Sequence, residues 1–191
     1  MKLRLFRVAL LGSAIMVSGC TSTPEPVESR PATWAQPASL PAPGNFYQVD
    51  EAIFRSAVPG AEHIAALRKA GIRTILNLRG EEGDTAAFQS AGFVTRQYPM
   101  GAGRVTQADL VAVLKIIRES PKPVLVHCWH GSDRTGFIIA GYRVVHQGWT
   151  KEEAVRELRG GGFGFHYVFA NIPATVNALD VEAVRRELDT P

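Results

Sequence analysis

One stretch, residues 124–136, limits the possible fold more than any other part of the chain. It reads VLVHCWHGSDRTG. A β-branched apolar run, Val124–Val126, ends at Cys128, and after five further residues Arg134 opens a strongly apolar segment, Phe137–Val145. This pattern predicts a buried strand, a tight loop and a buried helix, in that order. The chain is therefore expected to form a layered α/β structure with this strand in its interior.

The loop between strand and helix has the composition of an anion site. Its backbone N–H groups are expected to point toward a common centre, and the following helix adds the positive end of its dipole there. Such surroundings favour the thiolate of Cys128, lowering a thiol pKa from ~8.5 to ~3.5–7.5. The planar guanidinium of Arg134 fits two phosphate oxygens at once. A thiolate nucleophile in an anion nest predicts attack on a phosphate ester.

These residues resemble the signature loop of the cysteine-dependent protein tyrosine and dual-specificity phosphatases, which reads His-Cys, five residues, Arg-Ser/Thr-Gly. We call residues 127–134 the signature loop. Two other interpretations are a rhodanese-like sulfurtransferase, which generally lacks the Arg-Thr-Gly ending, and a structural buried cysteine beside a loop arginine. The positions that match the phosphatase pattern are His127, Cys128, Gly131, Arg134, Thr135 and Gly136.

The resemblance implies a role for each part of the loop. Cys128 would attack phosphorus and form a phosphocysteine, and the Thr135 hydroxyl would donate toward its sulfur. His127 would order the loop through side-chain hydrogen bonds, or it is simply a packed histidine at a strand end. No metal or cofactor is expected, because the nest and the arginine supply the positive field. The expected catalytic residues are Cys128, Arg134, Asp133 and Thr135, and the expected phosphate-binding residues are Trp129, His130, Gly131, Ser132, Asp133 and Arg134.

The general acid is where the chain departs from the family pattern. The family's usual aspartate lies on a loop before a helix of the kind that begins at Thr106, but here residues 98–104 contain no carboxylate. Protonation of the leaving group contributes ~10²–10⁴-fold to the rate. Asp133 is one candidate, since myotubularin phosphatases also carry an aspartate there, and its alternative role is structural. Asp109 is a second candidate, although with Thr106 it fits a helix capping box.

Other sources of the proton are more distant. Glu81, Glu82 and Asp84 lie on another loop. A further possibility is that no protein group acts as the acid, in which case only substrates with good leaving groups, such as aryl phosphates, would react quickly.

Residues 1–19 have the pattern of a targeting segment. Lys2, Arg4 and Arg7 precede a mostly apolar run that is too short to be a good membrane span, and small residues lead to Cys20. The segment resembles a bacterial lipobox, so lipidation of Cys20 and anchoring to the cell envelope are expected. The alternative is ordinary signal cleavage. Thr21 after the cysteine favours an outer-membrane location facing the periplasm, if the source is Gram-negative.

The charge balance gives no support for nucleic-acid binding. The chain has 21 Lys+Arg and 18 Asp+Glu, and three of the basic residues lie in the targeting segment. The remaining side chains therefore balance at 18 of each sign. With Cys20 lipidated and Cys128 catalytic, the two cysteines leave none for a disulfide.

The domain organisation follows from composition and periodicity. Residues 20–44, rich in Pro, Ser, Thr and Ala, are expected to form a tether, and residues 45–188 one phosphatase domain. Alternating strands and helices predict a single α/β domain with a central, mostly parallel sheet flanked by helices, similar to the dual-specificity phosphatases, and a ligand loop at the carboxyl end of a central strand. Gly160–Gly164 is interpreted as a flexible connection, and a last helix is expected near 176–188.

The substrate class is indicated only by the variable loop positions. Trp129 and His130 are neither Lys nor Arg, whereas phosphatases of highly phosphorylated inositols often carry basic residues there. This favours phosphotyrosine or a simple phosphate monoester. Three functions are therefore considered: a tyrosine or dual-specificity phosphatase in the cell envelope, a non-catalytic phosphate-binding lipoprotein module, and a structural envelope lipoprotein whose loop is a relic.

Overall fold

The strand predicted around Val124–Val126 lies inside a six-stranded sheet of order β1-β2-β3-β6-β4-β5 in the computed structural model, which describes residues 30–38 and 42–190. The four strands β3, β6, β4 and β5 are parallel, and β1 and β2 extend the sheet antiparallel at one edge. The predicted mostly parallel α/β fold is confirmed. The strands are β1 (Gln36–Pro37), β2 (Tyr47–Gln48), β3 (Ile53–Ser56), β4 (Thr74–Asn77), β5 (Val94–Gln97) and β6 (Val124–His127).

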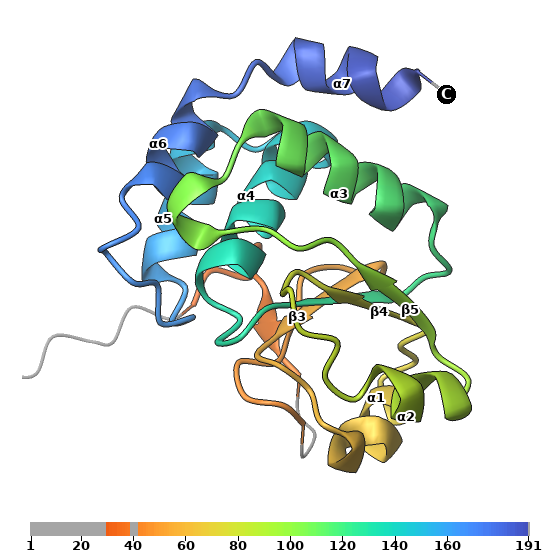
Figure 1. Cartoon of the computed structure of the whole chain (residues 1–191). Helices are drawn as coiled ribbons and strands as arrows, with labels where there is room; N and C mark the ends of the chain where they lie inside the picture. Colours follow the sequence, from red (N-terminus) through yellow and green to blue (C-terminus); the bar gives the residue numbers. More distant parts are fainter. Residues whose placement is uncertain (1–29, 39–41, 191) are drawn as a thin grey trace, which may run out of the picture.

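Helices cover both faces of the sheet unequally (Figure 1). The larger layer contains α3 (Gln107–Glu119), α4 (Asp133–His146), α5 (Lys151–Gly160), α6 (Asn171–Ala178) and α7 (Val181–Asp189). The smaller layer contains α1 (Ile64–Lys69) and α2 (Thr85–Ser90). Short 3₁₀ turns, η1 (Ala61–His63) and η2 (Ala102–Arg104), precede α1 and α3.

Successive side chains of a strand point to opposite faces of the sheet, so the central strands contribute to two separate parts of the core, one on each face. Val124 and Val126 of β6 pack in the core beneath the larger helical layer, whereas Leu125 packs in the smaller core with α1 and α2. In β4, Leu76 and Ile75 divide in the same way. Both faces of β6 are thus buried, which explains why its sequence is continuously apolar rather than alternating.

Helix α4 is buried on nearly all sides because it lies between the sheet and several other helices. Phe137, Ile138 and Ile139 are all at most 1% exposed. The interpretation of Phe137–Val145 as a helix buried in the middle of the domain is confirmed. A helix fixed in this way holds the loop that precedes it.

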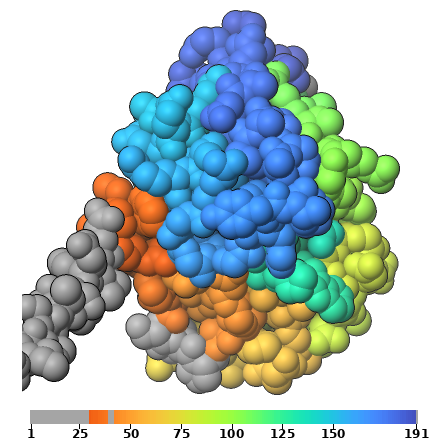
Figure 2. Space-filling model, turned by 90° about the vertical axis from the view of Figure 1, so that its left-hand side faces the viewer, coloured from red at the N-terminus to blue at the C-terminus, as the bar shows by residue number. Residues whose placement is uncertain are grey.

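Part of the predicted tether is folded onto the domain. Ala35 is fully buried, and its N–H donates to the Glu157 carboxylate at 2.6 Å, while the Arg30 guanidinium lies 4.9 Å from the centre of the Tyr47 ring. Figure 2 shows this orange segment beside the light-blue residues of α5. The tether prediction is wrong for residues 30–38, because a buried carboxylate and a sheet edge provide partners for the backbone. Residues 1–19 and Cys20 lie outside the described part of the chain.

The single helix predicted near 176–188 is two helices, α6 and α7. The chain is non-helical at Leu179, and the Asp180 carboxylate accepts a hydrogen bond from Ala183 N at 2.9 Å. Asp180 therefore begins a new helix as an N-cap instead of continuing the previous one. The capping box predicted at Thr150 is confirmed.

In the part of the chain that the structure describes, no helix combines the length and the apolar character that crossing a membrane requires.

Candidate active site

The signature loop connects the carboxyl end of β6 to the first turn of α4. The loop lies at the carboxyl end of the central strand β6, which pairs with β3 and β4 on its two sides, and this is the predicted position. Three successive carbonyl groups of the loop turn outward, and each accepts a hydrogen bond from a group outside the loop. The donors are Val58 N, Asn45 Nδ2 and Arg55 Nη2, and the acceptors are the carbonyls of Trp129, His130 and Gly131, at 3.0, 3.0 and 2.6 Å.

In a trans peptide the carbonyl and the N–H point in opposite directions, so the N–H groups of residues 130–132 lie on the side away from these carbonyl partners. Among the described residues, none accepts a hydrogen bond from the N–H groups of residues 129–134. These donors, with the N-terminus of the 14-residue helix α4 behind them, form an anion-binding nest.

Gly131 allows the loop to turn this tightly. Its φ is +72°, and a Cβ atom built there would lie 2.5 Å from the carbonyl carbon and oxygen of Ser56. We expect Gly131→Ala to shift the loop off β3 and to destabilise the protein by about 1–3 kcal/mol, because both the backbone conformation and the space exclude a side chain. Hydrolysis of p-nitrophenyl phosphate should fall at least tenfold.

Gly83→Ala is the matched control for Gly131→Ala. Gly83 also has a positive φ, +59°, but nothing lies within 4 Å of a Cβ built there. Its substitution therefore carries only the conformational strain, and thermal unfolding and hydrolysis should change much less. Equal effects of the two substitutions would contradict the close contact between Gly131 and Ser56.

Cys128 lies at the base of the loop with 2% of its surface exposed, and it is a free thiol. A buried arginine, Arg55 of β3, lies behind the loop with 1% exposure. Burial lowers the pKa of Arg55 to about 10, while the negative charges of Glu157 and Cys128 oppose that shift. Arg55 therefore stays cationic at neutral pH and adds positive potential near the sulfur.

Arg55 was missed as a site residue. The sequence contained one indication of its role: Arg55 is a charged residue within a strand that is otherwise buried, and a buried charge requires a partner. The partners are the Gly131 carbonyl and the ring of Phe163, whose centre lies 3.5 Å from the guanidinium carbon.

His127 is buried at the end of β6, with 4% of its surface exposed. Burial, with the nearby charges of Arg79 and Arg134, lowers its pKa to about 4, although the hydrogen bond to the Cys128 carbonyl opposes the shift. Since a carbonyl only accepts, the ring Nδ1 that lies 3.3 Å from it carries the hydrogen. This contact accords with the predicted loop-ordering role, which stays a prediction.

The predicted hydrogen bond from Thr135 to the Cys128 sulfur is not seen. The Thr135 Oγ1 atom is buried and has no hydrogen-bond partner among the described residues.

Arg134 is partly exposed, and its Nη1 makes a long contact of 3.5 Å with the Met100 carbonyl. This contact places residues 98–104, the segment without a carboxylate, next to the Arg134 side chain.

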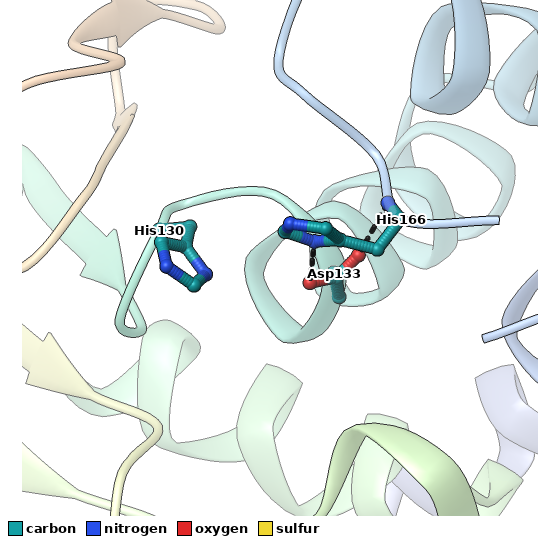
Figure 3. A group of neighbouring side chains, drawn as sticks. All are labelled: His130, Asp133 and His166. Atoms are coloured by element: carbon teal, nitrogen blue, oxygen red, sulfur yellow. Dashed lines mark hydrogen bonds and ion pairs between the residues drawn. The ribbon is translucent and has the colours of Figure 1, made fainter. Parts of the chain in front are cut away.

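Asp133, the first residue of α4, has its carboxylate held by a residue from a distant segment. One oxygen accepts from His166 N at 3.0 Å, and the other lies 2.8 Å from His166 Nδ1 (Figure 3). Asp133 is 6% exposed, whereas the His166 side chain is 47% exposed. His166 was not predicted as a site residue, and nothing local in the sequence marks it as one.

Three of the four other carboxylate candidates for the general acid, Asp109, Glu81 and Asp84, have partners elsewhere. Asp109 forms the predicted capping box with Thr106 and also accepts from the Tyr98 hydroxyl at 2.9 Å. Glu81 pairs with Arg79 at 3.1 Å, and Asp84 accepts from Ala61 N at 2.7 Å.

The glycine-rich segment 160–164 is an ordered support for the loop, so the interpretation as a flexible connection is wrong. Phe163 is 2% exposed, and its carbonyl accepts hydrogen bonds from Ser132 Oγ at 2.5 Å and from Asn45 Nδ2 at 2.7 Å. Gly162 and Gly164 each have a φ of +72°, which favours glycine, so these glycines allow the turns that bring Phe163 to the signature loop.

Trp129 stands at the rim of the site. Its side chain is 52% exposed, and the Arg79 guanidinium carbon lies 4.3 Å from the ring centre. One aromatic face is thus available to an approaching molecule, next to a buried cation.

Comparisons with known proteins agree with this geometry. A family model described as "Polymorphic toxin system, DSP-PTPase phosphatase" matches residues 51–148. The dual specificity protein phosphatase TpbA of Pseudomonas aeruginosa is 34% identical over 185 residues, covering 96% of this chain and 83% of TpbA. The inositol diphosphatase DSP2 of Oryza sativa subsp. japonica is 30% identical over 124 residues, covering 60% of this chain and 61% of that protein.

Solved structures show the same fold. A crystal structure of a Cys→Ser variant of P. aeruginosa TpbA in complex with pTyr superposes with a TM-score of 0.75 at 32% identity, covering 85% of this chain and all of that one. The catalytic core of the PP-IP phosphatase Siw14 from S. cerevisiae gives a TM-score of 0.69 at 26% identity, covering 78% of this chain and 93% of that one.

Proposed function

The chain belongs to the dual-specificity protein phosphatase family, and from this membership we propose that it hydrolyses phosphotyrosine, through a phosphocysteine, in the cell envelope. It is a cysteine-dependent phosphatase, and therefore a hydrolase. The phosphotyrosine substrate, the role of each residue in the reaction and the location in the cell envelope are our proposals.

The observation that carries the proposed chemistry is the row of N–H groups that follows Cys128 in the signature loop and has no acceptor among the described residues. Three outward carbonyls, each bound by a donor outside the loop, fix this arrangement before any ligand arrives. Such a preorganised nest stabilises the charge on the equatorial oxygens of a transferring phosphoryl group.

The proposed reaction has two steps. The Cys128 thiolate attacks phosphorus, the bond from phosphorus to the ester oxygen breaks, and the leaving oxygen takes a proton. Water then attacks the phosphocysteine, and Cys128 leaves as a thiolate while inorganic phosphate forms. Arg134 and the loop N–H groups hold the three phosphoryl oxygens in both steps.

The proposed substrate follows from the rim of the site. The half-exposed ring of Trp129 can stack on a substrate aromatic ring while Arg79 covers its other side. The related TpbA was crystallised with pTyr. The basic residues expected for a highly phosphorylated inositol are absent from positions 129 and 130.

The substrate is tested by comparing kcat/KM for a phosphotyrosine peptide, a phosphoserine peptide and a diphosphoinositol phosphate. We expect the phosphotyrosine peptide to be preferred, and Trp129→Ala to raise KM for it about tenfold, corresponding to the loss of one aromatic contact of about 1.4 kcal/mol. Higher kcat/KM for the diphosphoinositol phosphate would contradict the proposed substrate.

We propose Asp133 as the proton donor for the leaving group, because it directly precedes Arg134 in the signature loop, whereas Asp109 is held in a helix cap and Glu81 in an ion pair. Asp133→Asn keeps the shape but removes the acid. Alkyl phosphate hydrolysis should fall by ~10²–10⁴-fold, whereas an aryl phosphate with a good leaving group should lose much less.

Asp109→Asn is the control for Asp133→Asn, because Asp109 caps α3. It should lower the melting temperature while leaving the ratio of aryl to alkyl rates unchanged. Equal losses on both substrates in Asp133→Asn would show that Asp133 only supports the loop through His166.

The location in the cell envelope rests on the lipobox-like sequence before Cys20. Metabolic labelling of the full chain with a fatty acid, compared with Cys20→Ser, tests this. Label lost in the variant, with the protein released from the membrane fraction, is the expected result. Equal labelling or equal membrane association of both would contradict the anchor.

The two non-catalytic interpretations are disfavoured. A binding module or a structural lipoprotein does not require the thiol nucleophile, the arginine and the nest together, and the relative that matches 96% of this chain is named as a phosphatase.

A further inference from the structure

Three potential metal ligands from two separate segments gather beside the signature loop. His130 lies within the loop, Asp133 begins α4, and His166 follows the segment that supports the loop. Each offers one ligand atom, and the three atoms all lie within 4.8 Å of one another. In Figure 3 the His166 ring extends over the first turn of α4 toward His130.

The backbone that carries these ligands, and the Asp133 carboxylate itself, are held by contacts that do not depend on a metal. The Asp133 carboxylate is nearly buried and is bound to His166 through both oxygens, at 3.0 and 2.8 Å. The His130 carbonyl is held by Asn45, and Ser132 ties the signature loop to Phe163. A preformed site of this kind loses less conformational entropy when an ion binds than a site on mobile loops does.

The site is also open to solvent. Both imidazoles line a shallow, open hollow of the surface, so an ion held by them could keep water as its remaining ligands. The two histidine rings lie 5.1 Å apart between their centres, so a small rotation of either ring can direct a nitrogen at a shared ion.

The donor set indicates which class of ion would bind. Imidazole nitrogen is a ligand for zinc, copper, nickel and iron, whereas magnesium and calcium prefer sets made of oxygen alone. Two histidines and one carboxylate, with water in the fourth position, form a common zinc arrangement. We propose that His130, Asp133 and His166 form a binding site for a divalent transition metal ion, with Zn²⁺ as the test ion.

An ion at this position would join the signature loop to the segment 161–166. Binding to the folded state alone stabilises that state by mass action, so the melting temperature should rise with the metal concentration. The proposed hydrolysis needs no such ion, but it uses Asp133 as the proton donor, so an ion bound to this carboxylate should slow the hydrolysis of alkyl phosphates.

The experiment is isothermal titration of the full, untagged chain with ZnCl₂, together with thermal unfolding at the same metal concentrations. We expect binding of one equivalent and a raised melting temperature. His130→Ala and His166→Ala should each weaken binding tenfold or more, because each removes one of three protein ligands. His63→Ala, which removes a histidine far from the cluster in sequence, is the control and should bind normally.

The catalytic thiol is the main competing ligand, and Cys128→Ser separates the two. In the proposed site, Zn²⁺ binding persists in Cys128→Ser, and the Co²⁺-substituted protein shows d–d bands without a thiolate charge-transfer band. Binding that is lost in Cys128→Ser and retained in His166→Ala would overturn the proposal, as would no binding by the unmodified chain at micromolar Zn²⁺.

A folding defect is distinguished by two measurements. Thermal unfolding of each variant without metal shows whether it is folded, and Asp133→Asn offers a second variant that preserves the shape of the side chain. Weakened binding in Asp133→Asn with an unchanged metal-free melting temperature supports the site. Unchanged affinity in both Asp133→Asn and His166→Ala would refute it.

Discussion

Cys128→Ser is expected to abolish the hydrolysis of p-nitrophenyl phosphate, with kcat reduced by roughly 10⁴-fold or more. A serine hydroxyl at the base of the loop has no adjacent general base, because His127 is buried, neutral and directed at a carbonyl group. The oxyanion-binding groups would remain intact, so the loss would reside in the nucleophile alone. Steady-state kinetics of the unmodified chain and the variant measure it.

The second cysteine provides the control for Cys128→Ser. Cys20→Ser removes the proposed lipid attachment point but should hydrolyse p-nitrophenyl phosphate in solution at the unmodified rate. Vanadate should inhibit both the unmodified chain and Cys20→Ser, since it can adopt the five-coordinate geometry of a phosphoryl group during transfer and would bind in the same nest. Unchanged activity in Cys128→Ser would end the assignment of the nucleophile.

Glu157→Ala is expected to give the largest loss of stability, about 3–5 kcal/mol in the free energy of unfolding. The Glu157 carboxylate binds Arg143 through both oxygens, at 2.8 and 3.0 Å, and the side chains of this pair are at most 3% exposed. Removing Glu157 leaves the Arg143 cation buried without its counter-ion. It also removes the acceptor for Ala35 N.

Glu152→Ala on the same helix is the matched control, because Glu152 is exposed and its loss should change the free energy of unfolding by no more than about 0.5 kcal/mol. Urea denaturation of both variants measures the difference. Similar midpoints for the two would show that the buried pair contributes no net stability.

The N-terminal segment should respond to the same substitution. With Glu157 absent, residues 30–38 lose a buried hydrogen bond, and limited proteolysis should cut them faster than in Glu152→Ala. The negative charge of Glu157, on α5, also raises the pKa of Arg55, the buried arginine behind the signature loop. Its removal should therefore change the electrostatic potential near Cys128 as well.

The sequence by itself determined the features that depend on neighbouring residues. The nucleophile, the nest and the arginine lie within one loop, so their spacing predicts the chemistry without any knowledge of distant contacts. The same holds for the capping boxes at Thr106 and Thr150, which join residues three positions apart. The alternation of strand and helix patterns along the chain predicted the α/β fold, because each element must bury one face.

Only the tertiary structure decided what surrounds that loop. The Gly131 carbonyl is bound by Arg55 from 76 positions away, the His130 carbonyl by Asn45 from 85, and Asp133 by His166 from 33. No local pattern marks these partners, because their approach depends on the strand order and on how α4 and α5 pack. The same reason explains why residues 30–38 read as a tether: their order comes from a buried carboxylate on a distant helix, a contact that composition and periodicity do not encode.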